Sequence, residues 1–197
     1  MEIAAGLHRI ETLVGNRHLY QHLYIGERIL LVDTGTTDTL ETHVFPYLES
    51  LGRDPSEIDM AVITHADADH FGGNESLKRV AGKAWIACHA FDAEWISDPD
   101  EIMEGRYNQF SSDHGMRYPV DVRQYLRGMM GKAIPIDITL TGGETIHIDG
   151  SRSLNVLFLP GHTKGHIGLY DPSERLAVLT DAVLSFGRGS PMWTGGW

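Results

Sequence analysis

Apolar and polar positions along the chain follow two periods, and segments of each period alternate. Residues 7–15 and 19–35 carry alternating or continuous apolar runs, which predicts antiparallel strands at the start of a sheet. Residues 37–52 instead repeat apolar side chains at every third or fourth position. This spacing predicts a helix that Asp38 caps and that Pro46 kinks, because proline lacks the N–H of the helical ladder.

The following segments continue the alternation of strand and helix. Residues 59–64, "DMAVIT", are a short apolar run that we interpret as a buried strand, and residues 83–90 predict another. Between them, residues 74–82 predict a helix that ends at a glycine. Apolar strands return at residues 154–162 and 175–183, and each leads into a polar side chain that can bind metal. This alternation predicts an α/β fold.

Residues 91–135 interrupt the pattern with aromatic, methionine and charged residues in no regular period. Helical turns are predicted at residues 100–107 and 120–130. We interpret the segment as an insertion that covers the body of a single domain, residues 1–197, and shapes a substrate pocket. Its large apolar side chains form either a pocket wall or ordinary core and dimer contacts: Trp95, Tyr107, Phe110, Tyr118, Met129 and Met130.

Composition narrows the classes of partner. The 197 residues are 42% hydrophobic, enough for a sizeable core, and the net charge of −11 disfavours a nucleic-acid partner. No apolar run approaches the roughly 20 residues that span a bilayer, so no membrane association is predicted. Cys88 is the only cysteine, which excludes an internal disulfide and a cysteine-based zinc cluster. With no signal peptide evident, we expect a cytoplasmic protein.

Potential metal ligands crowd into residues 64–73, "THADADHFGG". They follow the predicted strand at 59–64 and therefore lie on a loop at its carboxyl end. Imidazole nitrogen and carboxylate oxygen are both zinc ligands. His65 and Asp67 can turn toward one point, while Asp69 and His70 turn toward a neighbouring one. The glycines that follow let another part of the backbone pass closely, since glycine has no Cβ.

Two distant strand ends can complete these sites. His162 follows a strand and a Pro-Gly turn, and Asp181 ends the next strand pattern. Ligands of α/β sheets collect beyond the carboxyl ends of strands. A carboxylate can bridge two cations, which makes Asp181 the natural shared ligand.

Plainer interpretations apply to other polar residues. Isolated histidines elsewhere are expected to be surface or structural residues, although His114 lies within the predicted insertion and can line a pocket. His166 is expected to be structural, with a hydrogen bond near the metal loop. Asp33 either caps its turn or orients a metal ligand. A chance crowding of polar residues is the alternative to a metal site, but three ordered segments argue against it.

Together, "HADADH", "PGHT" and "LTD" resemble the motifs of the metallo-β-lactamase superfamily. The resemblance covers residues 10–184 without the insertion. It implies an αβ/βα sandwich of two mixed sheets flanked by helices. It also implies metal ligands, with one or two zinc ions as cofactor: His65, Asp67 and His162 at the first metal, Asp69 and His70 at the second, and Asp181 as the bridge.

This sequence departs from the family motif in two ways. Asp67 stands where the family usually has a histidine, so the site gains a negative charge and favours harder ions, with Fe or Mn as alternatives to zinc. No histidine follows His166 to complete the second site, and the closing strand and helix are missing from the pattern. Either the second site is incomplete and weakly occupied, or the chain is a fragment that lacks the C-terminal end of the sandwich; we favour the fragment.

By this resemblance we predict a metal-dependent hydrolase that uses a metal-bound hydroxide on a small-molecule ester, lactone, thioester or similar substrate. Asp69 is the predicted catalytic residue, which orients the nucleophile or carries its proton. One alternative is an iron-dependent redox protein of the same fold. Another is a degenerate domain that binds metal without turnover. A homodimer is a further expectation.

Overall fold

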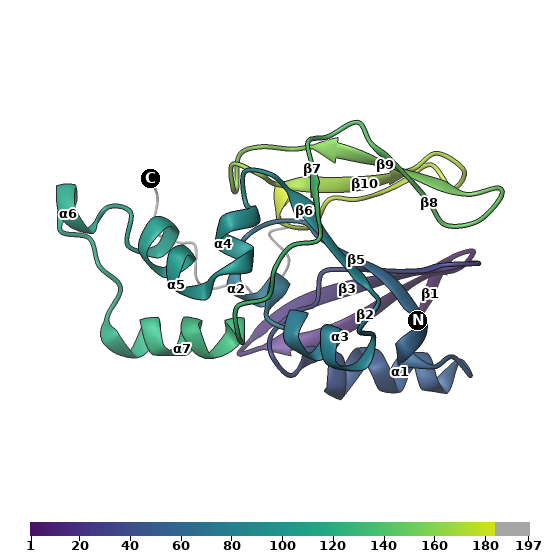
Figure 1. Ribbon diagram of the computed structural model, residues 1–197, viewed down its shortest axis with the longest axis horizontal. Helices are drawn as coiled ribbons and strands as arrows, with labels where there is room; N and C mark the ends of the chain where they lie inside the picture. The colour runs from purple at the N-terminus through teal and green to yellow at the C-terminus, as the bar shows by residue number, and fades with distance from the viewer. Residues whose placement is uncertain (184–197) are drawn as a thin grey trace.

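The computed structural model describes residues 1–183 of the chain and shows two β-sheets packed face to face, with helices outside (Figure 1). The two-sheet sandwich expected from the resemblance is confirmed. The expectation of a missing C-terminal end concerns the chain from residue 184 onward, which lies outside the described residues.

The larger sheet has seven strands in sequence order. Its first four strands pair antiparallel, and the fourth to seventh pair parallel. The strands are β1 (Glu2–Ala4), β2 (Leu7–Val14), β3 (Arg17–Ile25), β4 (Ile29–Val32), β5 (Ile58–Ile63), β6 (Trp85–His89) and β7 (Ile138–Leu140). Every residue of β4 is buried because both faces of the sheet are covered, which explains its unbroken apolar sequence.

The smaller sheet has four strands in the order β11-β10-β9-β8. We expected mixed pairing in both sheets, but the described strands of this one pair antiparallel throughout. Short loops connect its consecutive strands, and such hairpins allow only antiparallel neighbours. The strands are β8 (Thr145–His147), β9 (Ser153–Phe158), β10 (Ile167–Asp171) and β11 (Leu176–Val178).

Helices cover the outer face of the larger sheet, where Figure 1 shows α1 and α3. Within residues 1–183, none is both long and apolar enough to cross a bilayer. The helices are a π-helical turn (Leu40–Val44), α1 (Phe45–Ser50), a 3-10 turn (Pro55–Glu57), α2 (Ala68–Phe71), α3 (Asn74–Val80), α4 (Ala93–Ser97), α5 (Pro99–Ile102), a second π-helical turn (Met103–Tyr107), α6 (Ser111–His114), α7 (Val120–Met130) and a 3-10 turn (Thr180–Ala182).

The predicted helix over residues 37–52 is present but irregular. Its first part is the wide π-helical turn Leu40–Val44, and α1 follows with Pro46 in its first turn. The missing N–H of proline removes a regular helical hydrogen bond, and the wide turn accommodates that loss. Asp38 does not cap the helix; its carboxylate accepts a hydrogen bond from Thr36 Oγ1 instead.

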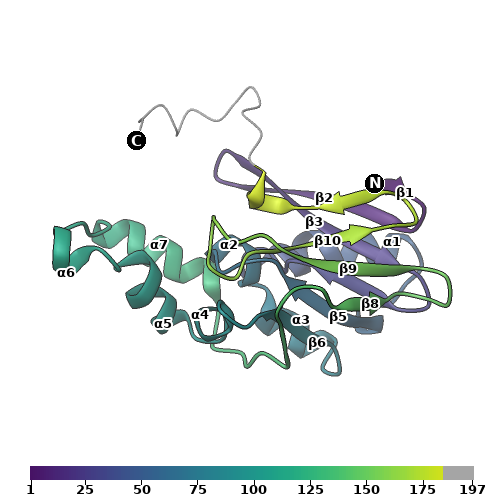
Figure 2. The ribbon, with the colours of Figure 1, turned by 90° about the horizontal axis from the view of Figure 1, so that it is seen from above.

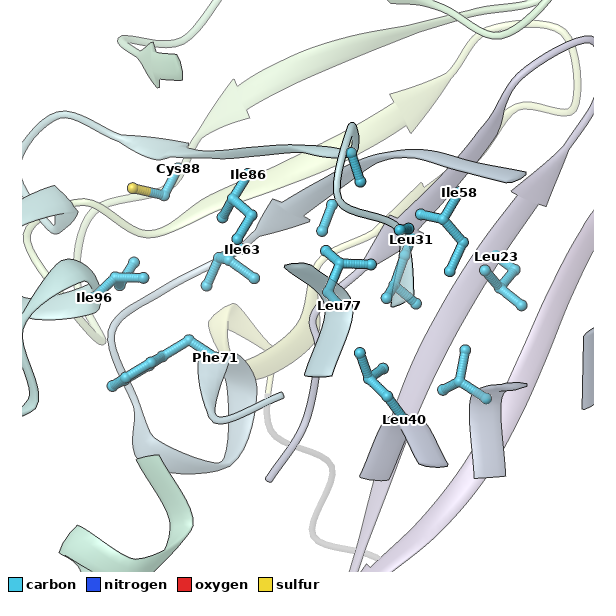
Figure 3. Close-up of a cluster of buried hydrophobic side chains, with 14 of the residues drawn as sticks. Leu23, Leu31, Leu40, Ile58, Ile63, Phe71, Leu77, Ile86, Cys88 and Ile96 are labelled. Carbon is cyan, nitrogen blue, oxygen red and sulfur yellow. The ribbon is translucent and has the colours of Figure 1, made fainter. Parts of the chain in front are cut away.

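Two apolar cores lie on the two faces of the larger sheet. One separates the sheet from the helices and includes Leu31, Phe71 and Cys88 (Figure 3). The other lies between the sheets and includes Leu30 and Leu154. Adjacent residues of β4 thus serve opposite cores, as the alternating direction of strand side chains requires.

The segment at residues 91–135 is mainly helical, and α5, α6 and α7 extend to one end of the molecule (Figures 1 and 2). Of the six residues predicted as a pocket wall or as core, Met130 is buried, and Trp95, Tyr107 and Met129 are partly buried and pack against the core. Phe110 and Tyr118 are exposed. Core packing therefore accounts for four of the six residues, and Trp95 also lines an open cleft.

Candidate metal centre

The histidine-aspartate loop follows β5, as predicted. β5 ends at Ile63, and α2 begins after Asp67, whose backbone is extended and whose carbonyl accepts the His70 N–H. This short helix turns Asp67 and His70 toward the same region while His65 stays on the loop before it. A tight strand-to-helix turn thus holds three ligand-type side chains at one sheet edge.

Two segments from the smaller sheet meet this loop. His162 follows β9, and Asp181 lies in the 3-10 turn after β11. One ligand atom from each of His65, Asp67, His162 and Asp181 lies within 4.8 Å of the others. Asp67 Oδ2 is 2.6 Å from His162 Nε2 and 3.5 Å from His65 Nε2. The 3.5 Å separation suits two atoms that bind one cation at about 2.0–2.2 Å each, whereas the 2.6 Å separation is that of a hydrogen bond.

The carboxylate of Asp181 faces His65 and His162 with one oxygen and His70 with the other. Its Oδ2 lies 3.8 Å from His162 Nε2 and 4.0 Å from His65 Nε2, and its Oδ1 lies 3.8 Å from His70 Nε2. The structure therefore brings together five of the six predicted ligands, with His65, Asp67, His70 and His162 around the carboxylate of Asp181. Asp69 is not in the group of four, and its negative charge acts to raise the pKa of His70.

Two buried imidazole nitrogens test whether this cluster fits a metal. The Nε2 atoms of His65 and His70 are buried and have no hydrogen-bond partner among the described residues. Their Nδ1 atoms are engaged, with Thr64 Oγ1 at 3.0 Å and with Asp33 Oδ2 at 2.8 Å. Since buried polar atoms are nearly always paired, these two nitrogens suit a cation, and the donor set fits one.

Burial and neighbouring charge act in opposite directions on these side chains. Burial lowers the pKa of His65. Burial also acts to lower the pKa of His70, but the Asp33, Asp69 and Asp181 carboxylates outweigh it and raise that pKa to about 10. The hydrogen bond to Asp67 raises the pKa of His162. A proton on His70 or His162 would compete with a cation, so metal binding should release it.

Asp33 combines the two roles that its sequence context left open. It is fully buried at the end of β4 and has a positive φ of 60°. Its carboxylate accepts hydrogen bonds from Thr64 N at 2.7 Å and Thr64 Oγ1 at 2.8 Å, and from His70 Nδ1. It therefore fixes the turn after β5 and also aims the Nε2 atom of His70 at the cluster.

His166 is structural, as expected. Its ring stacks on His65 with centroids 4.6 Å apart, and its Nε2 lies 3.2 Å from the Leu179 carbonyl. The glycines after His70 also behave as expected: a Cβ at Gly72 would lie 1.8 Å from the Met129 carbonyl oxygen, and one at Gly73 would lie 2.4 Å from that of Thr34.

Asp92 is a site residue that the sequence did not reveal. Its buried carboxylate accepts hydrogen bonds from Ala66 N at 3.1 Å, from Gly165 N at 2.8 Å and from Thr163 Oγ1. It thereby ties the loop of His65 to the turn of His162. The one available signal was an acidic residue shortly after a predicted strand, which by itself does not distinguish such a role from a surface position.

Arg106 was also missed as a site residue, and Tyr107 was named only as part of a pocket wall or of the core. Both come from the second π-helical turn, Met103–Tyr107, and both lie close to Asp67. Arg106 and His162 share the wall of an open cleft of about 400 Å³ beside the cluster. Its remaining lining residues are Trp95, Gln109, Pro160, Gly161, Thr163 and Lys164.

The amino-acid sequence is similar to those of several hydrolases. The chain is 29% identical over 154 residues to a hydroxyacylglutathione hydrolase of Erythrobacter litoralis, a match that covers 76% of this chain and 55% of the relative. It is 29% identical over 179 residues to an acyl-coenzyme A thioesterase of Bos taurus, covering 86% of this chain and 59% of the relative. The chain thus spans about half the length of the curated relatives it matches.

Solved structures share the fold. A metallo-beta-lactamase family protein from Thermus thermophilus superposes with a TM-score of 0.75 at 23% identity, covering 94% of this chain and 62% of the other. The native FEZ-1 metallo-beta-lactamase of Legionella gormanii gives a TM-score of 0.63 at 19% identity, covering 87% and 58%. The family described as the metallo-beta-lactamase superfamily matches residues 15–197. With its motif residues gathered at one sheet edge, this chain belongs to the metallo-beta-lactamase superfamily.

Proposed function

We propose that the chain carries the metal centre of a hydrolase that acts on small thioesters. The observation that supports this most is the convergence of His65, Asp67, His162 and Asp181. The buried Nε2 atoms of His65 and His70 have no hydrogen-bond partner within residues 1–183. Two relatives are a hydroxyacylglutathione hydrolase and an acyl-coenzyme A thioesterase, and both names describe the cleavage of thioesters.

Each side chain of the cluster, and Asp69 beside it, has a role in the proposed hydrolysis. Divalent cations held here would lower the pKa of a water molecule and polarise a substrate carbonyl. His65, Asp67 and His162 would hold one cation, His70 a second, and Asp181 both. Asp69 would orient the attacking water or carry its proton. The open cleft beside His162 offers room for the acyl or thiol part of the substrate.

The test measures thiol release by the chain after a chelator has removed metal and zinc, manganese or iron has been restored. We expect turnover of a glutathione or coenzyme A thioester with at least one metal. Asp181→Asn should reduce that turnover by more than about 100-fold, because even groups that only orient a ligand contribute roughly 10–100-fold. Asp113→Asn, at an exposed carboxylate in α6, should leave it unchanged.

Metal analysis separates this proposal from its alternatives. Turnover with zinc or manganese would favour hydrolysis. A coloured protein that retains iron and shows no turnover of thioesters, esters or lactones would favour the redox alternative. Metal binding without turnover under any metal would contradict the proposal and leave a domain that only binds metal.

A further inference from the structure

The carboxylate of Asp67 has a cationic partner from a distant segment. Arg106 directs its guanidinium at Asp67 Oδ1, with Nε at 2.8 Å and Nη2 at 2.5 Å. Both side chains are only 17% exposed. Two donors of one guanidinium on a single carboxylate oxygen form a strong, charge-assisted contact.

This contact divides the two oxygens of Asp67 between two tasks. Oδ1 faces Arg106 and lies 3.5 Å from the Tyr107 hydroxyl, while Oδ2 faces the Nε2 atoms of His162 and His65. The carboxylate therefore presents one defined oxygen to the cluster. Arg106 Nη1 also donates to the His162 carbonyl at 3.4 Å, so the same side chain contacts the backbone of a second ligand.

Charge explains why such a partner is needed at this position. Asp67 adds one negative charge compared with the neutral imidazole that the family motif carries here. An aspartate that lost its cation would be a poorly compensated buried anion, which is costly. Arg106 supplies one positive charge within contact distance and so returns the pair to neutrality.

We infer that Arg106 is a positioning residue, which pairs with Asp67 so that the two together replace one histidine of the metal centre. The inference rests on the proposed metal site and adds to it a dependence between two residues. Arg106 holds Oδ2 of Asp67 toward the cation and offsets the added charge. In a protein with histidine at position 67, the same arginine would be an uncompensated cation beside a metal ligand.

A double-mutant cycle on the full chain tests this dependence through zinc affinity, measured by competition with a chromophoric chelator, and through the absorption spectrum of bound cobalt. R106Q should weaken zinc binding by about 10–100-fold and change the cobalt spectrum. R106K keeps the charge but not the planar fork, so it should recover part of the affinity. R117Q, at an exposed arginine of the same segment, should match the wild type.

The decisive comparison is the sign of the effect in the D67H background. D67H/R106Q should bind zinc more tightly than D67H, the reverse of what R106Q does alone. An equal loss in both backgrounds would mean that Arg106 only supports the fold and would overturn the inference. So would wild-type affinity in R106Q. Circular dichroism of each variant identifies any that fails to fold, and R106K then replaces R106Q in the cycle.

The outcomes also separate this inference from the proposed function. A sign reversal without thioester turnover would support the Asp67–Arg106 pair and contradict the hydrolase. Turnover that persists with no sign reversal would support the hydrolase and contradict the pair. A wild-type chain that binds no zinc, manganese or iron would contradict both.

Discussion

Single carboxylates organise this site as much as the metal-facing side chains do. Asp33 and Asp92 are fully buried, and each accepts three hydrogen bonds from groups on the ligand loops. Neither faces the cluster directly. Their contribution is to hold His65, His70 and His162 in place before any cation arrives, which reduces the cost of ordering them on binding.

Asp92→Asn tests this role at the residue scale. Both oxygens of Asp92 accept hydrogen bonds, and an amide can accept on only one side, so one buried donor would lose its partner. We expect the free energy of unfolding of the metal-free chain to fall by about 1–3 kcal/mol, as measured by urea denaturation. Asp113→Asn, which removes an exposed carboxylate, should change it little; equal losses in the two variants would contradict the prediction.

The local pattern of the sequence explains which site residues could be predicted. His65, Asp67, His162 and Asp181 each follow an apolar strand, so their positions at one sheet edge can be read from short segments. Asp92 and Arg106 act through partners that are dozens of residues away, Ala66, Gly165 and Asp67 among them. Nothing in the periodicity of residues 91–135 indicates which of its charged residues turns inward.

At the scale of elements, the notable contact joins α2, which carries His70, to the C-terminal end of α7. The Gly72 backbone lies against the Met129 carbonyl, and the Thr37 hydroxyl donates to the Gly128 carbonyl at 3.4 Å. Backbones approach this closely only where side chains are absent. The predicted insertion is thereby fixed to the metal loop at a specific point.

A pair of alanine substitutions tests this contact because the two should have opposite signs. Gly72→Ala would place a methyl group 1.8 Å from the Met129 carbonyl oxygen, and we expect a loss of about 1–3 kcal/mol in unfolding free energy. Gly128→Ala adds a methyl group in open space within α7 and should stabilise by about 0.5–1 kcal/mol. Thermal and urea unfolding measure both. A neutral Gly72→Ala would show that α7 does not rest on the loop.

At the scale of the whole molecule, the site lies where the two sheets meet at the ends of β5, β9 and β11. Thr64 joins the sheets there: its carbonyl accepts the Ile167 N–H at 2.9 Å, and its hydroxyl accepts from Thr180 Oγ1 at 3.1 Å. Ligands from both sheets therefore keep their spacing only while the sandwich stays closed.

Two expectations about partners, that the chain binds no nucleic acid and that it forms a homodimer, stay predictions.

The closed sandwich also buries ionisable groups, which makes stability depend on pH. Burial lowers the pKa of His22 on β3 to about 4, from 6.5 in an unfolded chain. Between these values the unfolded chain binds a proton that the folded chain does not, so unfolding free energy should fall as pH drops from 6.5 toward 4.

His22→Gln should flatten this pH dependence by up to about 1.4 kcal/mol per pH unit in the metal-free protein. A residual slope is expected, because burial also lowers the pKa of His166 to about 4. His43→Gln, at an exposed histidine, should keep the wild-type slope. Urea titrations at several pH values measure the three proteins, and a slope in His22→Gln equal to that of the wild type would contradict the prediction.

The burial of Cys88 has a practical consequence. This one cysteine of the chain is shielded in the core between sheet and helices, and its burial raises the pKa of the thiol. A protonated, shielded thiol reacts slowly with colorimetric disulfide reagents. Glutathione or coenzyme A freed from a thioester would then be the only fast-reacting sulfhydryl in the cuvette, and hydrolysis could be followed continuously with almost no signal from the protein itself.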